Sequence, residues 1–195
     1  MGARPNTIFV YVTRILGQPK GDVQHRSCAM PYAKSTSLLA LAGFGLATAG
    51  AALYGARYSR KGKRDAWYRD LEKPSFTPPD KVFPVVWTTL YALIAWSGWR
   101  IWSAAPSRER NHVLSLWVSQ LGTNAKWPKL FFRDHRPVMA LVDVIALEAT
   151  IISYIAAARK IDRAAARAFI PYAAWVAFAA VLNEEIARLN PQQDW

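Results

Sequence analysis

The chain has almost no cysteine and few acidic residues for its length. Of its 195 residues, only Cys28 is a cysteine, which excludes a disulfide framework and a zinc site built on cysteines. Asp and Glu number 13 against 25 Lys and Arg, so the net charge is +12. Such a charge is typical of nucleic-acid-binding proteins and also of membrane proteins with cationic loops. The positions of the basic residues distinguish these two classes.

The motifs of common catalytic centres are also missing. The sequence contains no glycine-rich phosphate loop and no nucleophile elbow. His25, His112 and His135 lack a Cys, Asp or Glu at the spacing of a metal site. One histidine alone could be an axial haem ligand, but His112 and His135 lie at opposite ends of one expected helix and could not share an iron. We therefore expect no metal site and no acid–base centre.

Long apolar runs are present instead. Residues 37–56 carry no charge over a length that crosses a hydrocarbon core. Similar runs occupy residues 82–104, 112–132, 138–158 and 169–189. The run 112–132 is the weakest, because amide and lysine side chains interrupt it. The sequence predicts an all-α integral membrane protein: a five-transmembrane-helix domain over residues 37–190, a disordered polar basic tail over 1–36 and a C-terminal tail over 191–195.

The basic residues fall mainly between these runs. The segment 57–81 holds eight and the segment 159–167 holds four. This is the pattern of a multi-pass membrane protein with cationic loops, and it argues against a nucleic-acid partner. Five spans put equal numbers of basic residues on the two sides of the membrane, so the positive-inside rule gives no orientation.

Prolines and aromatic residues mark the loop before the second run. Lys73-Pro74 and Thr77-Pro78-Pro79 favour extended or turn backbone. We therefore expect an ordered loop between the first and second helices.

Aromatic residues recur at helical spacing in several runs. Phe83, Trp87 and Tyr91 follow at i, i+4 and i+8, and lie nearly on one helix face. Asn124 and Trp127 share a face of the third helix, as Trp175 and Phe178 do in the fifth. Aromatic walls with one amide suit a flat, largely apolar ligand. The alternative is that these stripes are ordinary packing or interfacial aromatic residues.

The loop and second helix resemble the TspO/MBR family, the tryptophan-rich sensory proteins and 18 kDa translocator proteins. The matching positions in this part are Trp67, Tyr68, Leu71, Lys73, Pro74, Phe76, Pro78, Pro79, Phe83, Trp87, Leu90 and Tyr91. The match resumes at Asn124, Trp127, Leu130, Phe131 and Phe132, at Ala140, Leu141, Val142 and Asp143, and at Pro171, Tyr172, Trp175, Phe178, Ala179, Leu182 and Asn183. The resemblance covers about residues 37–190.

The resemblance implies a function. Members of the family bind porphyrins, haem-type tetrapyrroles and hydrophobic drug-like molecules, and some bind sterols. It implies a membrane protein that requires no cofactor, binds porphyrin or haem as a ligand in a bundle pocket, and acts in tetrapyrrole transport, sensing or stress-linked regulation. The expected ligand-binding residues are Trp67, Pro79, Phe83, Trp87, Tyr91, Asn124, Trp127, Asp143, Trp175 and Phe178.

Three other functions stay open. Some members degrade protoporphyrin in light, and Trp87 and Trp175 match the positions implicated there. The chain could instead translocate a sterol or another lipid ligand, or act as a partner protein without a ligand. Glu184 argues against sterol, because it stands where the sterol motif of animal members needs an aromatic residue. The departures from the animal pattern favour a bacterial membrane over the mitochondrial outer membrane.

Two further features concern the helices themselves. Gly43, Ala47, Ala51 and Gly55 form a ridge of small residues that either packs inside the bundle or forms a homodimer contact. Charges also occur inside the expected spans: Asp143, Glu148, Lys126, Lys129, Glu184 and Glu185. A pair between one of the lysines and Asp143, Glu148 or Glu184 would lower the cost of burying both charges, and Lys126 in a cavity could meet a porphyrin propionate.

Overall fold

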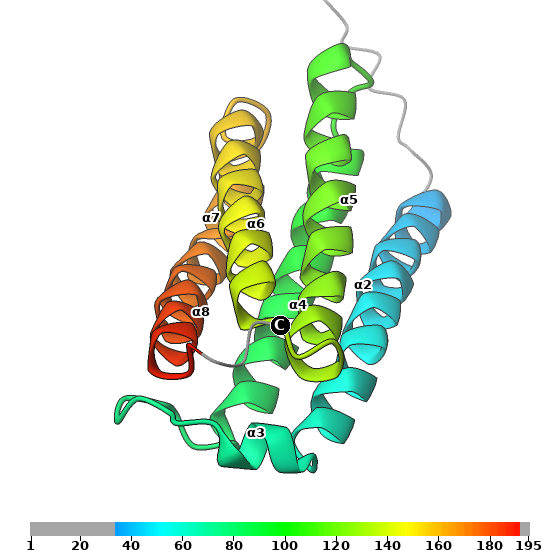
Figure 1. Ribbon diagram of the computed structural model, residues 1–195. Coiled ribbons are helices and arrows are strands. Elements are labelled where there is room, and N and C mark those ends of the chain that lie inside the picture. The colour runs from blue at the N-terminus through cyan, green and yellow to red at the C-terminus, as the bar shows by residue number, and fades with distance from the viewer. Residues whose placement is uncertain (1–33, 192–195) are drawn as a thin grey trace, which may run out of the picture. The chain divides into compact units, whose positions relative to one another are not determined.

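The computed structural model describes residues 34–191, with side chains from residue 37, and the regular structure of this part consists of helices without strands. The predictions for the two tails concern residues almost entirely outside it. The long helices lie side by side in a bundle (Figure 1). They are α2 (Lys34–Gly62), α4 (Val82–Trp102), α5 (Arg108–Pro128), α6 (Pro137–Ala158) and α8 (Ile170–Leu189). The predicted all-α bundle is confirmed.

Within the described residues, four segments are both long and apolar enough to cross a membrane: Ser37–Gly62, Val82–Trp102, Pro137–Ala158 and Arg163–Leu189. The fifth long helix, α5, has 21 residues, which is enough to span, but it carries charged residues at both ends. It packs against α2 on one side and α6 on the other. The weakest run of the sequence is therefore a full-length helix of the bundle.

Two helix boundaries differ from the sequence prediction. The first helix continues beyond residue 56 to Gly62, so Arg57, Arg60 and Lys61 lie on its last turns. Basic side chains there interact favourably with the carboxyl end of the helix dipole. Helix α5 begins at Arg108, before residue 112, because the Ser107 side chain accepts a hydrogen bond from the Arg110 N–H at 3.0 Å.

The end of α5 changes its helical type. Pro128 closes the helix, and a π-helical turn, η1 (Lys129–Arg133), follows directly. Proline has no N–H, so the regular i to i−4 hydrogen-bond ladder cannot continue unchanged through it. The turn places Phe131 and Phe132 in the interior, where both are buried.

Small residues of α2 meet this turn. A Cβ atom added at Gly55 would lie 3.2 Å from Cγ of Pro128, and one at Gly62 would overlap Phe132. Ala51 packs against the core, whereas Gly43 and Ala47 are exposed. The small-residue ridge thus has an inner half that serves the bundle and an outer half that no described residue covers.

The loop between α2 and α4 is ordered, as expected. It contains the short helix α3 (Ala66–Asp70), and its Leu71 and Pro74 are buried. Asn190, next to the end of α8, accepts a hydrogen bond from the Glu72 N–H at 3.0 Å and donates one to the Glu72 carbonyl at 2.9 Å. The loop is therefore fastened to the end of the last long helix.

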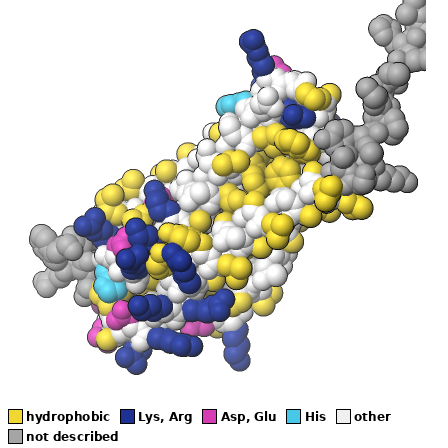
Figure 2. All heavy atoms as spheres, turned by 90° about the vertical axis from the view of Figure 1, so that its right-hand side faces the viewer, with side chains coloured by type: hydrophobic (Ala, Val, Ile, Leu, Met, Phe, Trp, Pro, Cys, Tyr) yellow, Lys and Arg dark blue, Asp and Glu magenta, His cyan; other side chains and the backbone are white. Residues whose placement is uncertain are grey.

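The surface of the helices suits a bilayer. Viewed from the α2 side, hydrophobic side chains cover the middle of the face, while Lys and Arg gather towards one end (Figure 2). On α2 the exposed apolar residues include Leu38, Leu39, Leu46 and Leu53. A surface of this kind is costly in water but not against lipid.

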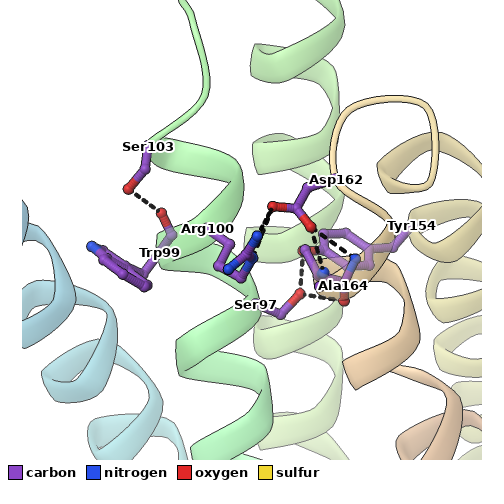
Figure 3. A network of polar contacts seen from close by, with 8 residues as sticks. Ser97, Trp99, Arg100, Ser103, Tyr154, Asp162 and Ala164 are labelled. Carbon is purple, nitrogen blue, oxygen red and sulfur yellow. Dashed lines mark hydrogen bonds and ion pairs between the residues drawn. The ribbon is translucent and has the colours of Figure 1, made fainter.

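The short helix α7 (Arg163–Ala168) is held by a polar network at one end of the bundle (Figure 3). Asp162 accepts hydrogen bonds from the Ala164 and Ala165 N–H groups and, at 2.8 Å, from Arg100 Nε. The Ser97 hydroxyl lies 2.7 Å from the Tyr154 hydroxyl and donates to the Ala165 carbonyl. These contacts join α4, α6 and α7.

Candidate ligand site between two aromatic helix faces

Aromatic side chains from α4 and α8 meet inside the bundle. In the described part α4 packs closely against α2, α5 and α7, and its rings bridge to α8. The ring centroids of Phe83 and Trp175 are 5.8 Å apart, and those of Trp87 and Tyr172 are 6.2 Å apart. Within each helix the spacing seen in the sequence stacks Trp87 near Tyr91 and Trp175 near Phe178. The structure therefore brings together five of the predicted ligand-binding residues: Phe83, Trp87, Tyr91, Trp175 and Phe178.

These rings are only partly covered. Phe83, Trp87, Trp175 and Phe178 are all half-buried, whereas Tyr172 behind them is fully buried. Half-buried aromatic surface on two facing helices can stack on a flat apolar ligand. We refer to these two faces as the aromatic walls.

Asn124 of α5 connects the two walls. It accepts a hydrogen bond from the Tyr91 hydroxyl at 2.8 Å and donates to the Tyr172 hydroxyl at 3.0 Å. Its side chain is almost fully buried. An amide has two N–H donors and a carbonyl with two lone pairs, so Asn124 keeps one donor and one acceptor position for a further partner.

Trp127 faces a neighbouring part of the interior. Its Nε1 donates to Asn183 Oδ1 at 3.0 Å, and the Asn183 amide donates to the Pro137 carbonyl at 2.8 Å. The indole stacks on Phe131 with centroids 5.0 Å apart. Trp127 therefore packs under the loop, one helical turn from Asn124.

Trp67 belongs to the loop that covers this cluster. It stacks on His135 with centroids 4.2 Å apart and meets Phe131 edge-on at 5.8 Å. His135 has φ 54°, the left-handed region that side chains other than glycine rarely adopt. Pro79 is exposed in the same loop, and its carbonyl accepts a hydrogen bond from Val82 at the start of α4. Trp67 and Pro79 are thus placed in the loop rather than on the aromatic walls.

Asp143 is the remaining predicted residue, and it is buried on α6. Its carboxylate forms an ion pair with Lys126 at 2.5 Å, and its side chain is 3% exposed against 56% for Lys126. Of the pairs considered from the sequence, this one forms. Lys129 instead lies 3.8 Å from Asp134, and Glu185 pairs with Arg188.

Sequence reasoning missed several residues as parts of the site. Tyr172 bonds Asn124 and Asn183 bonds Trp127, both predicted site residues. Tyr172 lies three positions before Trp175, on the same helix face. That spacing could have identified Tyr172. No sequence signal pairs Trp67 with His135, which lies 68 positions away in another loop.

A hollow lies beside the Arg100–Asp162 network, away from the aromatic walls. It has a volume of about 270 Å³ and is lined by Trp99, Arg100, Ser103, Ala104, Ile161 and Asp162. Burial raises the pKa of Asp162, but hydrogen bonds from Arg100 and from the Ala165 and Ala164 N–H groups outweigh it and hold that pKa below the usual value. The described residues contain no cluster of three or more His, Cys, Asp or Glu that could hold a metal.

Comparison with known proteins identifies the family of this chain. The family model described as TspO/MBR family matches residues 40–189. The chain is 35% identical to Protein CrtK of Rhodobacter capsulatus over 127 residues, which is 65% of this chain and 79% of that protein. It is 37% identical to the Translocator protein of Sus scrofa over 131 residues, 66% of this chain and 78% of that protein.

A further bacterial relative is the Tryptophan-rich protein TspO of Chlorobaculum tepidum, 35% identical over 132 residues, 64% of this chain and 80% of that protein. The bacterial relatives support a bacterial membrane as the location, and the apolar helices make the protein multi-pass. The matched region contains all five long helices from residue 40 onward, the covering loop and both aromatic walls. The chain therefore belongs to the TspO/MBR family of membrane proteins.

Proposed function

We propose that the protein binds a porphyrin or haem-type tetrapyrrole between its aromatic walls, in tetrapyrrole transport, sensing or stress-linked regulation. The observation that carries this proposal is the meeting of α4 and α8 through half-buried rings, Phe83 against Trp175 and Trp87 against Tyr172. A tetrapyrrole is flat and largely apolar, so stacking on such rings would supply most of its binding free energy.

Asn124 supports the same proposal. Its amide contacts Tyr91 and Tyr172 and has one further donor and one further acceptor position, which could fix the orientation of a stacked ligand. The loop bearing Trp67 covers the adjoining Phe131 cluster and is fastened to α8 by Asn190, which would limit the access of water to that end.

Titration with protoporphyrin IX in detergent micelles tests the proposal. We expect saturable quenching of tryptophan fluorescence by the wild-type protein. Trp87→Ala and Trp175→Ala should each weaken binding about tenfold, because a buried aromatic contact contributes about 1–1.5 kcal/mol beyond simple partition.

Trp102→Phe is the matched control. Trp102 is on the same helix as Trp87, but it packs on Phe44 and lies near Arg110. It should leave protoporphyrin affinity unchanged. Quenching that rises without saturation and is indifferent to Trp87→Ala and Trp175→Ala would contradict the proposal.

Light-dependent porphyrin degradation is the second proposal for the same residues. It is favoured by the placement of Trp87 and Trp175 on the two walls, where a bound ring would lie within reach of two indoles. Illumination of the protoporphyrin complex in air should then yield a new absorbing product, and Trp→Phe at either position should abolish it while keeping binding. Photobleaching at the rate of free protoporphyrin would exclude this activity.

A further inference from the structure

Two buried acceptor oxygens near the aromatic walls have no hydrogen-bond partner among the described residues. Gln120 of α5 is 0% exposed. Its Nε2 donates to the Trp117 carbonyl at 2.9 Å, whereas its Oε1 is buried and unpartnered. Glu148 of α6 likewise has a buried, unpartnered Oε2. A buried acceptor without a donor costs free energy, and a carboxylate costs more than an amide.

The two residues adjoin the polar connection between the walls. Gln120 lies one helical turn before Asn124 on the same face of α5. Glu148 is near enough to the Tyr172 hydroxyl, which Asn124 contacts, to interact with it electrostatically.

The packing of α5 against α6 supports this placement. The two helices are consecutive and antiparallel in Figure 1, with Lys126 paired with Asp143. Gln120 lies six residues before Lys126 and Glu148 five residues after Asp143, so the two acceptors are at similar heights in the bundle.

Glu148 also differs from the carboxylates of the described helices and caps that form ion pairs. Asp143 pairs with Lys126, Asp162 with Arg100 and Glu185 with Arg188. No Lys, Arg or His of the described residues is within ion-pair distance of Glu148. Glu148 is half-buried with one oxygen fully covered, and a cationic partner would stabilise the charged form of a carboxylate placed in this way within a membrane span.

We propose that Gln120 and Glu148 bind the positively charged nitrogen of a flat aromatic amine whose ring lies between the aromatic walls. The N–H groups of such a nitrogen donate hydrogen bonds to Gln120 Oε1 and Glu148 Oε2, and its positive charge neutralises the Glu148 carboxylate. The indole and phenol rings of Trp87 and Tyr91 add cation–π attraction. This ligand class goes beyond a tetrapyrrole, and the inference rests on the proposed function because it uses the same walls.

The test compares two ligands of nearly equal shape and different charge. 9-Aminoacridine is cationic at neutral pH, and acridine is neutral. Their binding to the full chain in non-ionic detergent is measured by ligand fluorescence. We expect 9-aminoacridine to bind at least about tenfold more tightly than acridine, since hydrogen bonds to charged groups are strong ones.

Three variants test whether the preference for the cationic ligand depends on Gln120 and Glu148. Glu148→Gln should remove most of the preference for the cation while leaving acridine affinity unchanged. Gln120→Leu should weaken the cation several-fold, and its thermal unfolding in detergent shows whether it is folded. Glu184→Gln, the matched control, removes an exposed carboxylate on α8 and should change neither ligand.

The outcomes separate this inference from the proposed function. Equal affinities of the wild type for the two acridines, or a preference that survives Glu148→Gln, would overturn the inference. Saturable protoporphyrin quenching in the same preparation would then leave the tetrapyrrole proposal standing. Loss of the cation preference in Glu148→Gln but not in Glu184→Gln supports the amine site.

Discussion

At the residue scale, Asn124 is the buried side chain that joins three helices. It is the side chain through which α5 contacts both a tyrosine of α4 and a tyrosine of α8. A polar residue buried in a membrane bundle keeps its place only when its hydrogen bonds are made. Asn124 thus stabilises the bundle, and it would also contact the proposed ligand.

Replacing Asn124 by leucine should destabilise the protein. Asn124→Leu keeps the volume but leaves the Tyr91 and Tyr172 hydroxyls without this partner, at a cost of about 1–3 kcal/mol. Tyr91→Phe removes only one of the two hydrogen bonds and should cost about 1 kcal/mol or less. Thermal unfolding in detergent measures both. Equal stability of wild type and Asn124→Leu would show that the two hydrogen bonds contribute nothing net.

Asp162 is a residue whose charge stabilises a loop outside the spans. Its pKa is lowered in the folded protein, so its contribution is fully present above its unfolded pKa, about 3.9, and is lost as the pH falls through the lower folded value. Asp162→Asn keeps a side chain that can cap α7 but removes the charge that Arg100 pairs with. The variant should be less stable than wild type from pH 8 to 5.

The difference should shrink below about pH 4, where Asp162 takes up a proton in the unfolded chain. Unfolding midpoints of the two proteins across this range give the measurement. A difference that is independent of pH down to pH 2 would mean that packing, rather than the charge, accounts for the effect.

At the element scale, the small residues of α2 lie in two different environments. Towards its C-terminal end Gly55 and Gly62 allow close contact with Pro128 and Phe132. Towards its N-terminal end, no atom of the described residues lies within 4 Å of a Cβ atom added at Gly43. The homodimer contact expected from the sequence remains a prediction, and this division makes it testable.

Leucine at Gly55 and at Gly43 should therefore have different effects. Gly55→Leu would collide with Pro128 and should lower stability by about 1–3 kcal/mol. Gly43→Leu should leave the unfolding midpoint unchanged and should weaken self-association, measured by cross-linking in detergent at several protein concentrations. Unchanged cross-linking in Gly43→Leu and Ala47→Leu would contradict a dimer through this ridge.

At the scale of the whole molecule, the sequence allowed prediction of the features that repeat along one element. The apolar runs gave the long helices, and the i, i+4 spacing of Phe83, Trp87 and Tyr91 gave one aromatic wall. Helix boundaries were less predictable. The basic segment 57–62 was expected to be a loop, but it forms the last turns of α2, where basic side chains interact favourably with the helix dipole.

Contacts between distant elements could not be predicted. The stacking of Trp67 on His135 and the pairing of Arg100 with Asp162 each join residues more than 60 positions apart. Such pairs depend on how the helices pack, which no local pattern encodes. Lys126 with Asp143 was one of several equally allowed pairs, and the antiparallel packing of α5 and α6 selected it.

The attachment of Glu72 to Asn190 has a consequence for synthesis of the protein. A membrane chain is made from its N-terminus, so the loop before α4 exists long before the residue that fastens it. Until α8 is in place, the Glu72 backbone lacks the Asn190 side chain that it bonds in the finished bundle. The fastening of this loop is therefore completed only after α8 has been inserted.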